Sequence, residues 1–293
     1  MIPVMNIIAW GNVVPWTDQR QIEQDLVISR TLVELFSNPL LRDAVRFRGG
    51  TALNKLHFPR PLRYSEDIDL VRTTRGPIKP ILRAVRETLE PWLGEASFDS
   101  SPHSPKLRFK APAEGAASAE IRLKVEINTR EIDPCDRPLS LPFSVDNAWF
   151  TGRADIATFS REEILATKLR ALLQRNRGRD LFDLAHALEV FDGLNTTRVV
   201  ECLQYYLKLS NAKISRPQAQ ERMFDKLADP SFLKDMRPLL AADQAEKLDD
   251  AAVKAAFAKV YFGLITQIPG EAWASAEELE EKHGLAKVSV SAN

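Results

Sequence analysis

Residues 63–70 read RYSEDIDL, and this segment decides the fold around it. Acidic and aliphatic residues alternate, so on a β-strand Asp67 and Asp69 lie on one face while Ile68 and Leu70 lie on the other. Two neighbouring carboxylates repel each other and disfavour the strand unless a cation lies between them. A hard divalent ion such as Mg²⁺ takes one or two carboxylates together with phosphate oxygens. The pattern predicts either a metal-binding strand or a solvated edge strand with acidic side chains.

The segment upstream favours the metal-binding interpretation. Residues 47–53 read FRGGTAL, and they place Gly49, Gly50 and Thr51 between a short strand and the start of a helix. Glycine lets backbone N–H groups approach a phosphate closely, and the helix N-terminus adds a favourable dipole. A lone Gly-Gly pair is typical of ordinary turns. Gly-Gly-Thr followed by Asp-x-Asp on the next strand indicates a nucleotide phosphate site.

A third acid lies on a later predicted strand. Residues 119–128 alternate in polarity, and Glu126 faces away from the apolar neighbours on either side of it. A glutamate there could stand beside the aspartate pair of residues 63–70. The alternative is a surface glutamate paired with Lys124 or Arg122, and the spacing alone leaves both open.

The rest of the chain changes in character near residue 155. Before it, strands alternate with helices; after it, nearly every segment has helical periodicity. The predicted helices are 19–36, 77–93, 161–175, 178–191 and 197–209, and the predicted strands include 64–71, 106–110 and 119–128. This organisation predicts an α/β region with an antiparallel or mixed sheet, followed by an all-helical half. We expect two lobes, residues 1–155 and residues 156–293, with a cleft between them.

The helical half contains a lysine and two aspartates in unusual positions. Lys168 shares a helical stripe with Leu165 and Leu172, so its ammonium either extends to solvent or enters a polar pocket. Asp180 and Asp183 share one side of the next helix. Near a helix start, such acids also favour the helix dipole without any other role.

These segments together resemble a known family. FRGGTAL and SEDIDL resemble the nucleotidyltransferase superfamily signature of Gly-Gly or Gly-Ser followed by Asp-x-Asp, in the version of the AbiEii/AbiGii toxins. That family includes abortive-infection toxins and mycobacterial tRNA-modifying toxins. Its K-x-x-A-L and R-D-x-x-D-L motifs match Lys168, Arg179, Asp180 and Asp183, and the resemblance covers about residues 22 to 190. Many relatives carry Lys at the position of Arg48.

The resemblance implies a fold and a reaction. The fold is α+β, a nucleotidyltransferase-like mixed sheet with flanking helices, followed by a helical lobe that completes the cleft. The reaction is the Mg²⁺-dependent transfer of a nucleotide from an NTP to RNA, at the tRNA 3′ end, which blocks translation or phage growth. A cognate antitoxin protein is the implied partner.

The resemblance also implies roles for particular residues. The implied catalytic residues are Asp67, Asp69, Glu126, Lys168, Asp180 and Asp183, of which the first three hold Mg²⁺. The implied nucleotide-binding residues are Gly49, Gly50, Thr51, Ser65 and Lys168. The RNA contacts we predict are Arg170, Arg175, Arg177 and Arg179, a basic cluster at the edge of the expected cleft.

Composition limits how RNA could bind. The 293 residues include 40 Lys and Arg against 40 Asp and Glu, so the formal net charge is zero. Zero net charge excludes binding of nucleic acid by bulk positive charge, and a local basic patch is needed. Besides the four arginines, basic residues recur at 79, 83 and 86 with helical spacing and at 106, 108 and 110 with strand spacing. The hydrophobic fraction of 44% and the charged fraction of 27% exclude global disorder.

Cysteine content and the N-terminal segment bear on location. Cys135 and Cys202 are far apart in sequence and have no partner at metal-ligand spacing, which argues against a disulfide scaffold or a zinc site. The first 16 residues are apolar but lack a basic n-region and a run of about 18 apolar residues. We therefore predict a packed N-terminal segment, no membrane partner and a cytoplasmic location.

Other function classes share the predicted acids. A small-molecule nucleotidyltransferase would use the same carboxylates without extended basic tracks. Nucleotidyl or phosphoryl transfer to a protein is a second alternative, including self-modification at Ser65. A regulator that only binds Mg–NTP is a third. The destination of label from a labelled NTP distinguishes these classes.

Overall fold

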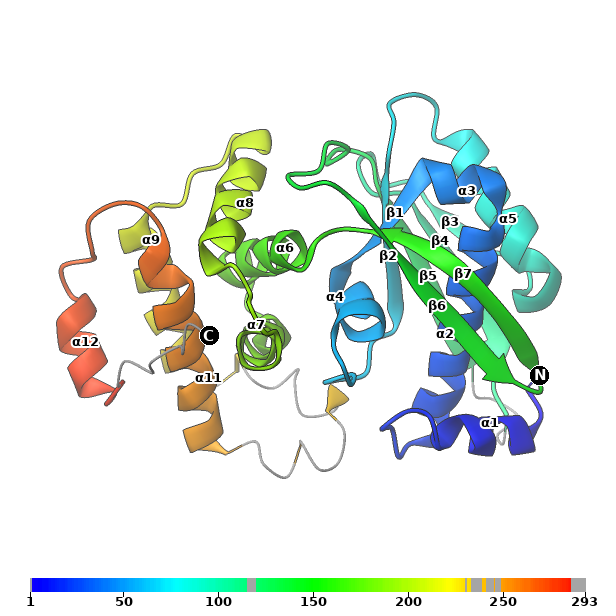
Figure 1. Cartoon of the computed structure of the whole chain (residues 1–293), viewed down its shortest axis with the longest axis horizontal. Helices are drawn as coiled ribbons and strands as arrows, with labels where there is room; N and C mark the ends of the chain where they lie inside the picture. The colour runs from blue at the N-terminus through cyan, green and yellow to red at the C-terminus, as the bar shows by residue number, and fades with distance from the viewer. Residues whose placement is uncertain are drawn as a thin grey trace. The chain divides into compact units, whose positions relative to one another are not determined.

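A computed structural model describes residues 2–114, 120–229, 231–232, 239–240, 245 and 249–285. The chain divides into two compact units, Met1–Ser160 and Arg161–Asn293. Figure 1 shows the sheet strands β1–β7 in the first and helices α6, α7, α8, α9, α11 and α12 in the second. No helix within the described ranges combines the length and the apolar composition that a membrane crossing requires.

The first unit is built on a seven-stranded sheet in the order β3-β4-β5-β2-β1-β7-β6. β2 runs parallel to β5 and β1 runs parallel to β7, whereas the other neighbouring pairs are antiparallel. The strands are β1 Val45–Arg48, β2 Asp67–Arg72, β3 Ser97–Asp99, β4 Lys106–Pro112, β5 Glu120–Asn128, β6 Leu139–Asn147 and β7 Phe150–Thr158. The mixed sheet confirms the predicted fold class.

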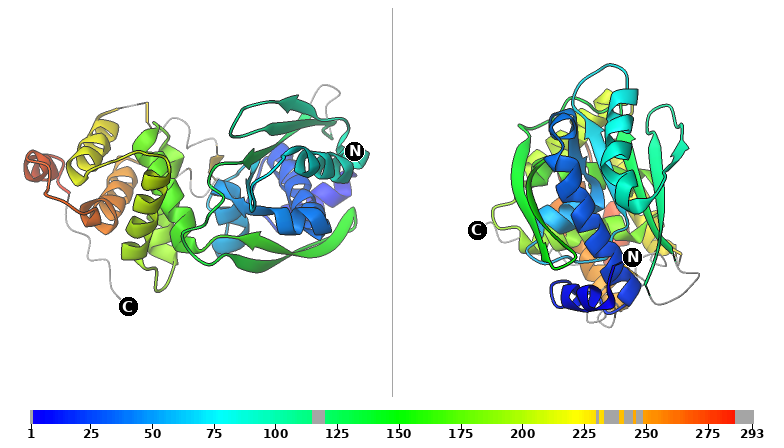
Figure 2. Two further views of the ribbon diagram at one scale, coloured as in Figure 1. Left: turned by 90° about the horizontal axis from the view of Figure 1, so that it is seen from above. Right: turned by 90° about the vertical axis from the view of Figure 1, so that its right-hand side faces the viewer.

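Helices pack against this sheet. They are α1 Val4–Gly11, α2 Gln19–Ser37, α3 Pro39–Ala44, α4 Gly49–Ala52, the π-helix η1 Leu53–His57 and α5 Lys79–Leu93. Helix α2 contacts β5, β6 and β7, and α5 contacts α2 and β4. Figure 2 shows α2 between the β6–β7 hairpin and α5 in its end-on view. Helix α2 is therefore the central support of the sheet.

Asp25 on α2 ties two further elements to this support. Its carboxylate accepts hydrogen bonds from the indoles of Trp10 (2.9 Å) and Trp16 (3.0 Å). It also pairs with the ammonium of Lys55 on η1, with 2.6 Å between Nζ and Oδ1. Because η1 continues directly from α4, this buried ion pair fixes the helix that begins at Gly49.

Strand β2 begins later than predicted. The sequence pattern predicts a strand over residues 64–71, whereas β2 begins at Asp67. The hydroxyl of Thr51 lies 2.6 Å from that of Ser65 and donates a hydrogen bond to the backbone carbonyl of Asp67. The Tyr64 ring packs edge-on against Trp16. Side-chain contacts to α4 and to the N-terminal region therefore hold the segment that the pattern assigned to the strand.

The second unit is helical, as predicted. Its helices are α6 Arg161–Gln174, α7 Gly178–Val190, α8 Thr196–Leu209, α9 Arg216–Ala228, α11 Asp250–Gly263, the 3₁₀-helix η3 Ile265–Gln267 and α12 Ala276–Lys282. Helix α6 contacts α7, α8 and α9, and α11 contacts α7 and α9. Phe257 and Tyr261 stack with ring centroids 5.7 Å apart, and Phe224 packs against both. These rings form the aromatic part of the core of the unit.

Candidate active site

The three predicted metal ligands lie on one face of the sheet. In the parallel register of β2 and β5, Asp67 is opposite Lys124 and Asp69 is opposite Glu126. Residues two apart on a strand share a face, so these four side chains form two adjacent rows. Ile68, between the two aspartates, is fully buried on the other face. The structure thus brings Glu126 beside the aspartate pair.

Lys124 pairs with Glu126, as the alternative interpretation of that glutamate expected, and it also contacts Asp67, which was not predicted. Its ammonium lies 2.9 Å from Asp67 Oδ2 and 3.3 Å from Glu126 Oε2. Burial alone would lower the pKa of Lys124, but hydrogen bonding and attraction from Asp67 and the charge of Glu126 outweigh burial and raise it. The side chain therefore stays protonated at neutral pH. Alternation along β5 already places Lys124 on the same face as Glu126. The sequence did not show that β2 pairs with β5 and so brings Asp67 next to Lys124.

Asp69 lies against the start of α4. Its pKa is raised because burial and the charges of Asp67 and Glu126 outweigh the attraction of Lys124 and Arg48. Gly49 has φ 85°, and a Cβ at this position would lie 2.2 Å from Asp69 Oδ2. Only glycine allows the carboxylate and the backbone to approach so closely here.

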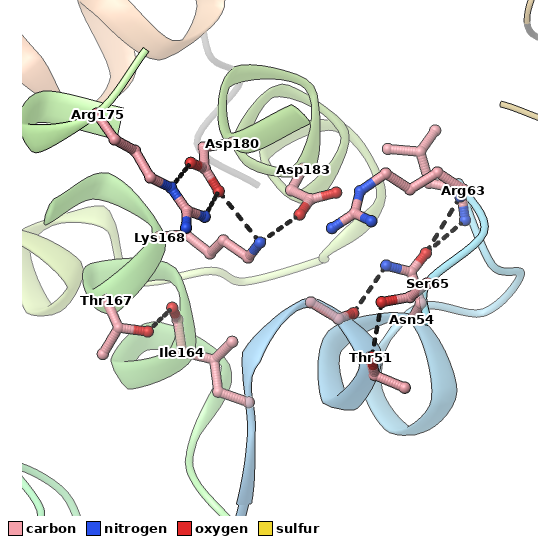
Figure 3. Close-up of polar contacts among 12 residues, drawn as sticks. Thr51, Asn54, Arg63, Ser65, Ile164, Thr167, Lys168, Arg175, Asp180 and Asp183 are labelled. Atoms are coloured by element: carbon pink, nitrogen blue, oxygen red, sulfur yellow. Dashed lines mark hydrogen bonds and ion pairs between the residues drawn. The ribbon is translucent and has the colours of Figure 1, made fainter. Parts of the chain in front are cut away.

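The predicted phosphate-binding residues lie together at α4. The hydroxyls of Thr51 and Ser65 are hydrogen-bonded to each other. Asn54 donates to the Gly50 carbonyl at 2.9 Å and accepts from the Leu62 amide at 2.9 Å, which ties the loop before Ser65 to the helix (Figure 3). The Gly-Gly-Thr turn is therefore held in place by hydrogen bonds of its own side chains and those of its neighbours.

The second unit has its own charged cluster. Lys168 is 6% exposed, and its Nζ lies 3.2 Å from Asp180 Oδ1 and 2.8 Å from Asp183 Oδ2. Arg175 binds Asp180 through two hydrogen bonds of 2.7 and 2.9 Å (Figure 3). Of the two alternatives for Lys168, the polar pocket is the one present. Burial alone would raise the pKa of Asp180, but Lys168 and Arg175 outweigh burial and lower it.

The four arginines predicted to contact RNA are in different environments. The guanidinium of Arg170 lies 5.2 Å from the centre of the Tyr206 ring, and that of Arg175 is bound to Asp180. Arg177 is exposed at the start of α7, and Arg179 is half-buried. The sequence prediction treated them as one basic cluster, whereas the structure places two of them against groups of their own unit.

The donor set of the first unit fits a divalent cation. Carboxylate oxygens are the ligands that hard divalent ions prefer, and Asp67, Asp69 and Glu126 supply three such groups. Ligand atoms of these three described residues do not all lie within 4.8 Å of one another. An ammonium, that of Lys124, lies against two of them instead. A positive charge already stabilises this arrangement of acids.

The comparisons with known proteins agree with this geometry. A family model described as nucleotidyl transferase AbiEii toxin, type IV TA system, matches residues 30–259. None of the curated proteins matches the sequence. The structure of MenT4, a nucleotidyltransferase toxin from Mycobacterium tuberculosis H37Rv, is 17% identical with a TM-score of 0.60, covering 92% of this chain and 94% of that one. JHP933 from Helicobacter pylori is 17% identical with a TM-score of 0.52, covering 92% and 97%. At this identity the two structures show the fold.

We expect Gly49→Ala to lower both stability and activity. A left-handed backbone costs a non-glycine residue about 1–2 kcal/mol, and the new methyl group would also displace the Asp69 carboxylate. Thermal unfolding and nucleotide transfer measure the two effects. Gly193→Ala is the matched control, because Gly193 has φ 65° and nothing within 4 Å of the added Cβ. Equal losses in both variants would show that the contact with Asp69 is unimportant.

The buried cluster of the second unit predicts a pH dependence of stability. The pKa of Asp180 in the folded protein is lowered from its usual 3.8. The ionised carboxylate therefore makes its full contribution to the free energy of unfolding above pH 3.8, and this contribution is lost as pH falls through the folded-state pKa. Asp180→Asn should destabilise the protein by about 3–5 kcal/mol at pH 7, because Lys168 and Arg175 lose a buried partner.

Thermal unfolding of both proteins from pH 7 to pH 3 checks this prediction. The difference between wild type and Asp180→Asn should narrow below about pH 4, where the Asp180 carboxyl of the unfolded chain takes up a proton before that of the folded protein does. The exposed Asp192→Asn is the control and should follow the wild type at every pH. A difference that stays constant over the whole range would contradict the assigned role of the charge.

Proposed function

Since this chain belongs to the AbiEii family of nucleotidyl transferase toxins, we propose that it transfers a nucleotide from an NTP to RNA, with the tRNA 3′ end as acceptor. The family makes the chain a nucleotidyltransferase, an NTP-using enzyme whose class typically depends on a divalent metal. The proposal adds that the metal is Mg²⁺, that the acceptor is RNA and that the modification blocks translation or phage growth. It carries over from the family a cognate antitoxin as partner.

The observation that carries the proposal is the acid face beside the Gly-Gly-Thr turn. Asp67, Asp69 and Glu126 would hold the divalent ion, which when bound neutralises charge on the phosphates. The backbone N–H groups at Gly49 and Gly50 would contact the triphosphate. The hydroxyls of Thr51 and Ser65 would contact it next to the aspartates. The contact between Gly49 and Asp69 supports this placement of phosphate beside metal ligand.

The reaction follows from this placement. The acceptor hydroxyl attacks the α-phosphorus of the NTP, the bond from that phosphorus to the bridging oxygen breaks, and pyrophosphate leaves. Glu126, as a carboxylate, would accept the proton of the attacking hydroxyl or help to bind a second ion. A fixed cation near the leaving group lowers the barrier, and the family motif gives that role to Lys168. Its contacts with Asp180 and Asp183 support an orienting role for both acids.

A basic pocket in the second unit supports a polyanionic acceptor. It has a volume of about 530 Å³, and its charged lining residues are Arg175, Lys213, Arg222 and Lys226. Arg222 donates to the Leu173 carbonyl at 3.1 Å and Lys226 to the Arg175 carbonyl at 2.9 Å, so both cations are held at the end of α6. Burial and the nearby Arg222 lower the pKa of Lys226. No acidic side chain lines this pocket among the described residues, and phosphate groups suit such a surface.

Loss of one metal ligand tests the reaction. We expect Asp69→Asn to reduce transfer of label from α-labelled NTP to RNA at least about a hundredfold, because the carboxylate would hold the metal. Asp99→Asn is the matched control, because this exposed acid on β3 pairs with Arg108 at the sheet edge. Label that enters only protein or a small molecule would overturn the RNA acceptor.

Loss of a proposed metal ligand also tests the toxin assignment in cells. Expression of the wild type should arrest growth, and Asp67→Ala should relieve the arrest while Asp99→Asn should not. Co-expression of the cognate antitoxin should restore growth. An intact protein that is harmless in several hosts would contradict the proposed effect on translation.

The basic pocket generates a separate prediction about RNA. Lys213→Ala should weaken tRNA binding and make the dependence of log K on log salt concentration shallower by about 0.7–0.9, the value for one lost phosphate contact. Binding titrations at several salt concentrations measure both quantities. Lys208→Ala is the control, because Lys208 is an exposed lysine on α8 outside the pocket lining. Identical salt slopes for the two variants would exclude the pocket as an RNA contact.

A further inference from the structure

Lys124 holds the position of a counter-ion within the acid face. Three carboxylates, those of Asp67, Asp69 and Glu126, share this face with one ammonium. The ammonium contacts two of them, at 2.9 and 3.3 Å, and the Lys124 side chain is 23% exposed. It reaches the acids from β5, and parallel pairing of β5 with β2 sets the contact with Asp67.

An ammonium and a divalent cation compete for the same oxygens. Asp67 and Glu126 belong to the proposed metal-binding set, and each directs one carboxylate oxygen at Lys124. Two cations at one pair of carboxylates repel each other strongly at this short range. A lysine ammonium on a four-carbon stem can move away by rotating side-chain bonds, without any change in the backbone.

The neighbouring cation is placed differently. Arg48 lies opposite Asp69 in the antiparallel register of β1 and β2; its charge acts to lower the pKa of Asp69, and its guanidinium is paired with Glu131. Arg122, two residues before Lys124 on β5, is paired with Glu120 at 3.3 Å. Within the part of the chain that the structure describes, the Lys124 ammonium is in direct contact with two of the three acids.

We propose that Lys124 is a resident cation that holds Asp67 and Glu126 in the metal-free protein and must release them when the divalent ion binds. The displaced ammonium then has the triphosphate as its partner. Without nucleotide, the free energy needed to release Lys124 from Asp67 and Glu126 weakens metal binding. A bound nucleotide removes this penalty because its triphosphate forms an ion pair with the displaced ammonium. Metal and NTP therefore bind cooperatively, and the coupling is reciprocal. This inference rests on the proposed function, because it takes the metal site from there.

Binding of Mn²⁺ to the full-length protein tests the proposal without any turnover. Electron paramagnetic resonance or calorimetry gives the affinity alone and with an NTP whose α,β-bridging oxygen is replaced by methylene. In the wild type the analogue should tighten Mn²⁺ binding. Lys124→Gln should bind Mn²⁺ alone about tenfold more tightly, and the tightening by the analogue should shrink. Unchanged or weaker binding of Mn²⁺ alone, or an unchanged nucleotide effect, would overturn the proposal.

Matched variants separate this role from bulk charge and from folding. Arg122→Gln removes the same charge from the same strand and should leave Mn²⁺ affinity near the wild-type value. Lys124→Arg keeps the charge, and its Mn²⁺ affinity should remain near the wild-type value. Thermal unfolding identifies any variant that fails to fold. Asp67→Asn should abolish binding. If neither the wild type nor Lys124→Gln binds Mn²⁺, the metal site of the proposed function is wrong. If both bind Mn²⁺ with equal affinity, the metal site stands and only the proposed role of Lys124 is rejected.

Discussion

Repulsion among carboxylates on one face of the β2–β5 pair is the constraint on which the first unit depends. Asp67, Asp69 and Glu126 are placed together by a parallel register that the opposite face enforces, because the residues between them are fully buried. A slip of one residue would bury the acids and expose Ile68, so the core fixes the register. The remaining strain is electrostatic. Lys124 relieves part of it, and the pKa of Asp69 stays raised, first because the carboxyl is buried and then because Asp67 and Glu126 are close.

The second unit solves a related problem by full burial. Asp180 and Asp183 have no exposed surface, and Lys168 and Arg175 supply the positive charges that make this tolerable. A buried ion pair adds little net stability over an apolar core, but the loss of one partner is expensive because a charge is then left without compensation. Such a cluster fixes the position of the Lys168 ammonium more rigidly than an exposed pair would. In the acid face of the first unit, by contrast, the lysine is partly exposed and can move.

Which parts of the site could be predicted depends on the range of the contact. Alternation along residues 63–70 places both aspartates on one face, because that signal is local. The Gly-Gly pair predicted a close approach of the backbone to a phosphate, whereas the approach of Gly49 to the Asp69 carboxylate joins α4 to β2 and was not predicted. The contacts of Lys124 with Asp67 and of Arg175 with Asp180 were not predicted. Their partners belong to other elements, on β2 for Lys124 and on α7 for Arg175, and no spacing in the sequence encodes those pairings. The start of β2 was misplaced because Ser65 is held by Thr51 of α4.

The sequence by itself determined the faces of each strand and helix, the order of the motifs and the family to which the chain belongs. Hydrophobic periodicity is a property of one segment, so it can be read from the sequence without knowing which other segments pack against it. The tertiary structure alone decided that β5 lies parallel to β2, that the Lys124 ammonium contacts Asp67 as well as Glu126, and that Lys168 points inward. These outcomes depend on which distant segments are packed together to bury apolar surface. Long-range packing, not local pattern, therefore set the charge balance of both clusters.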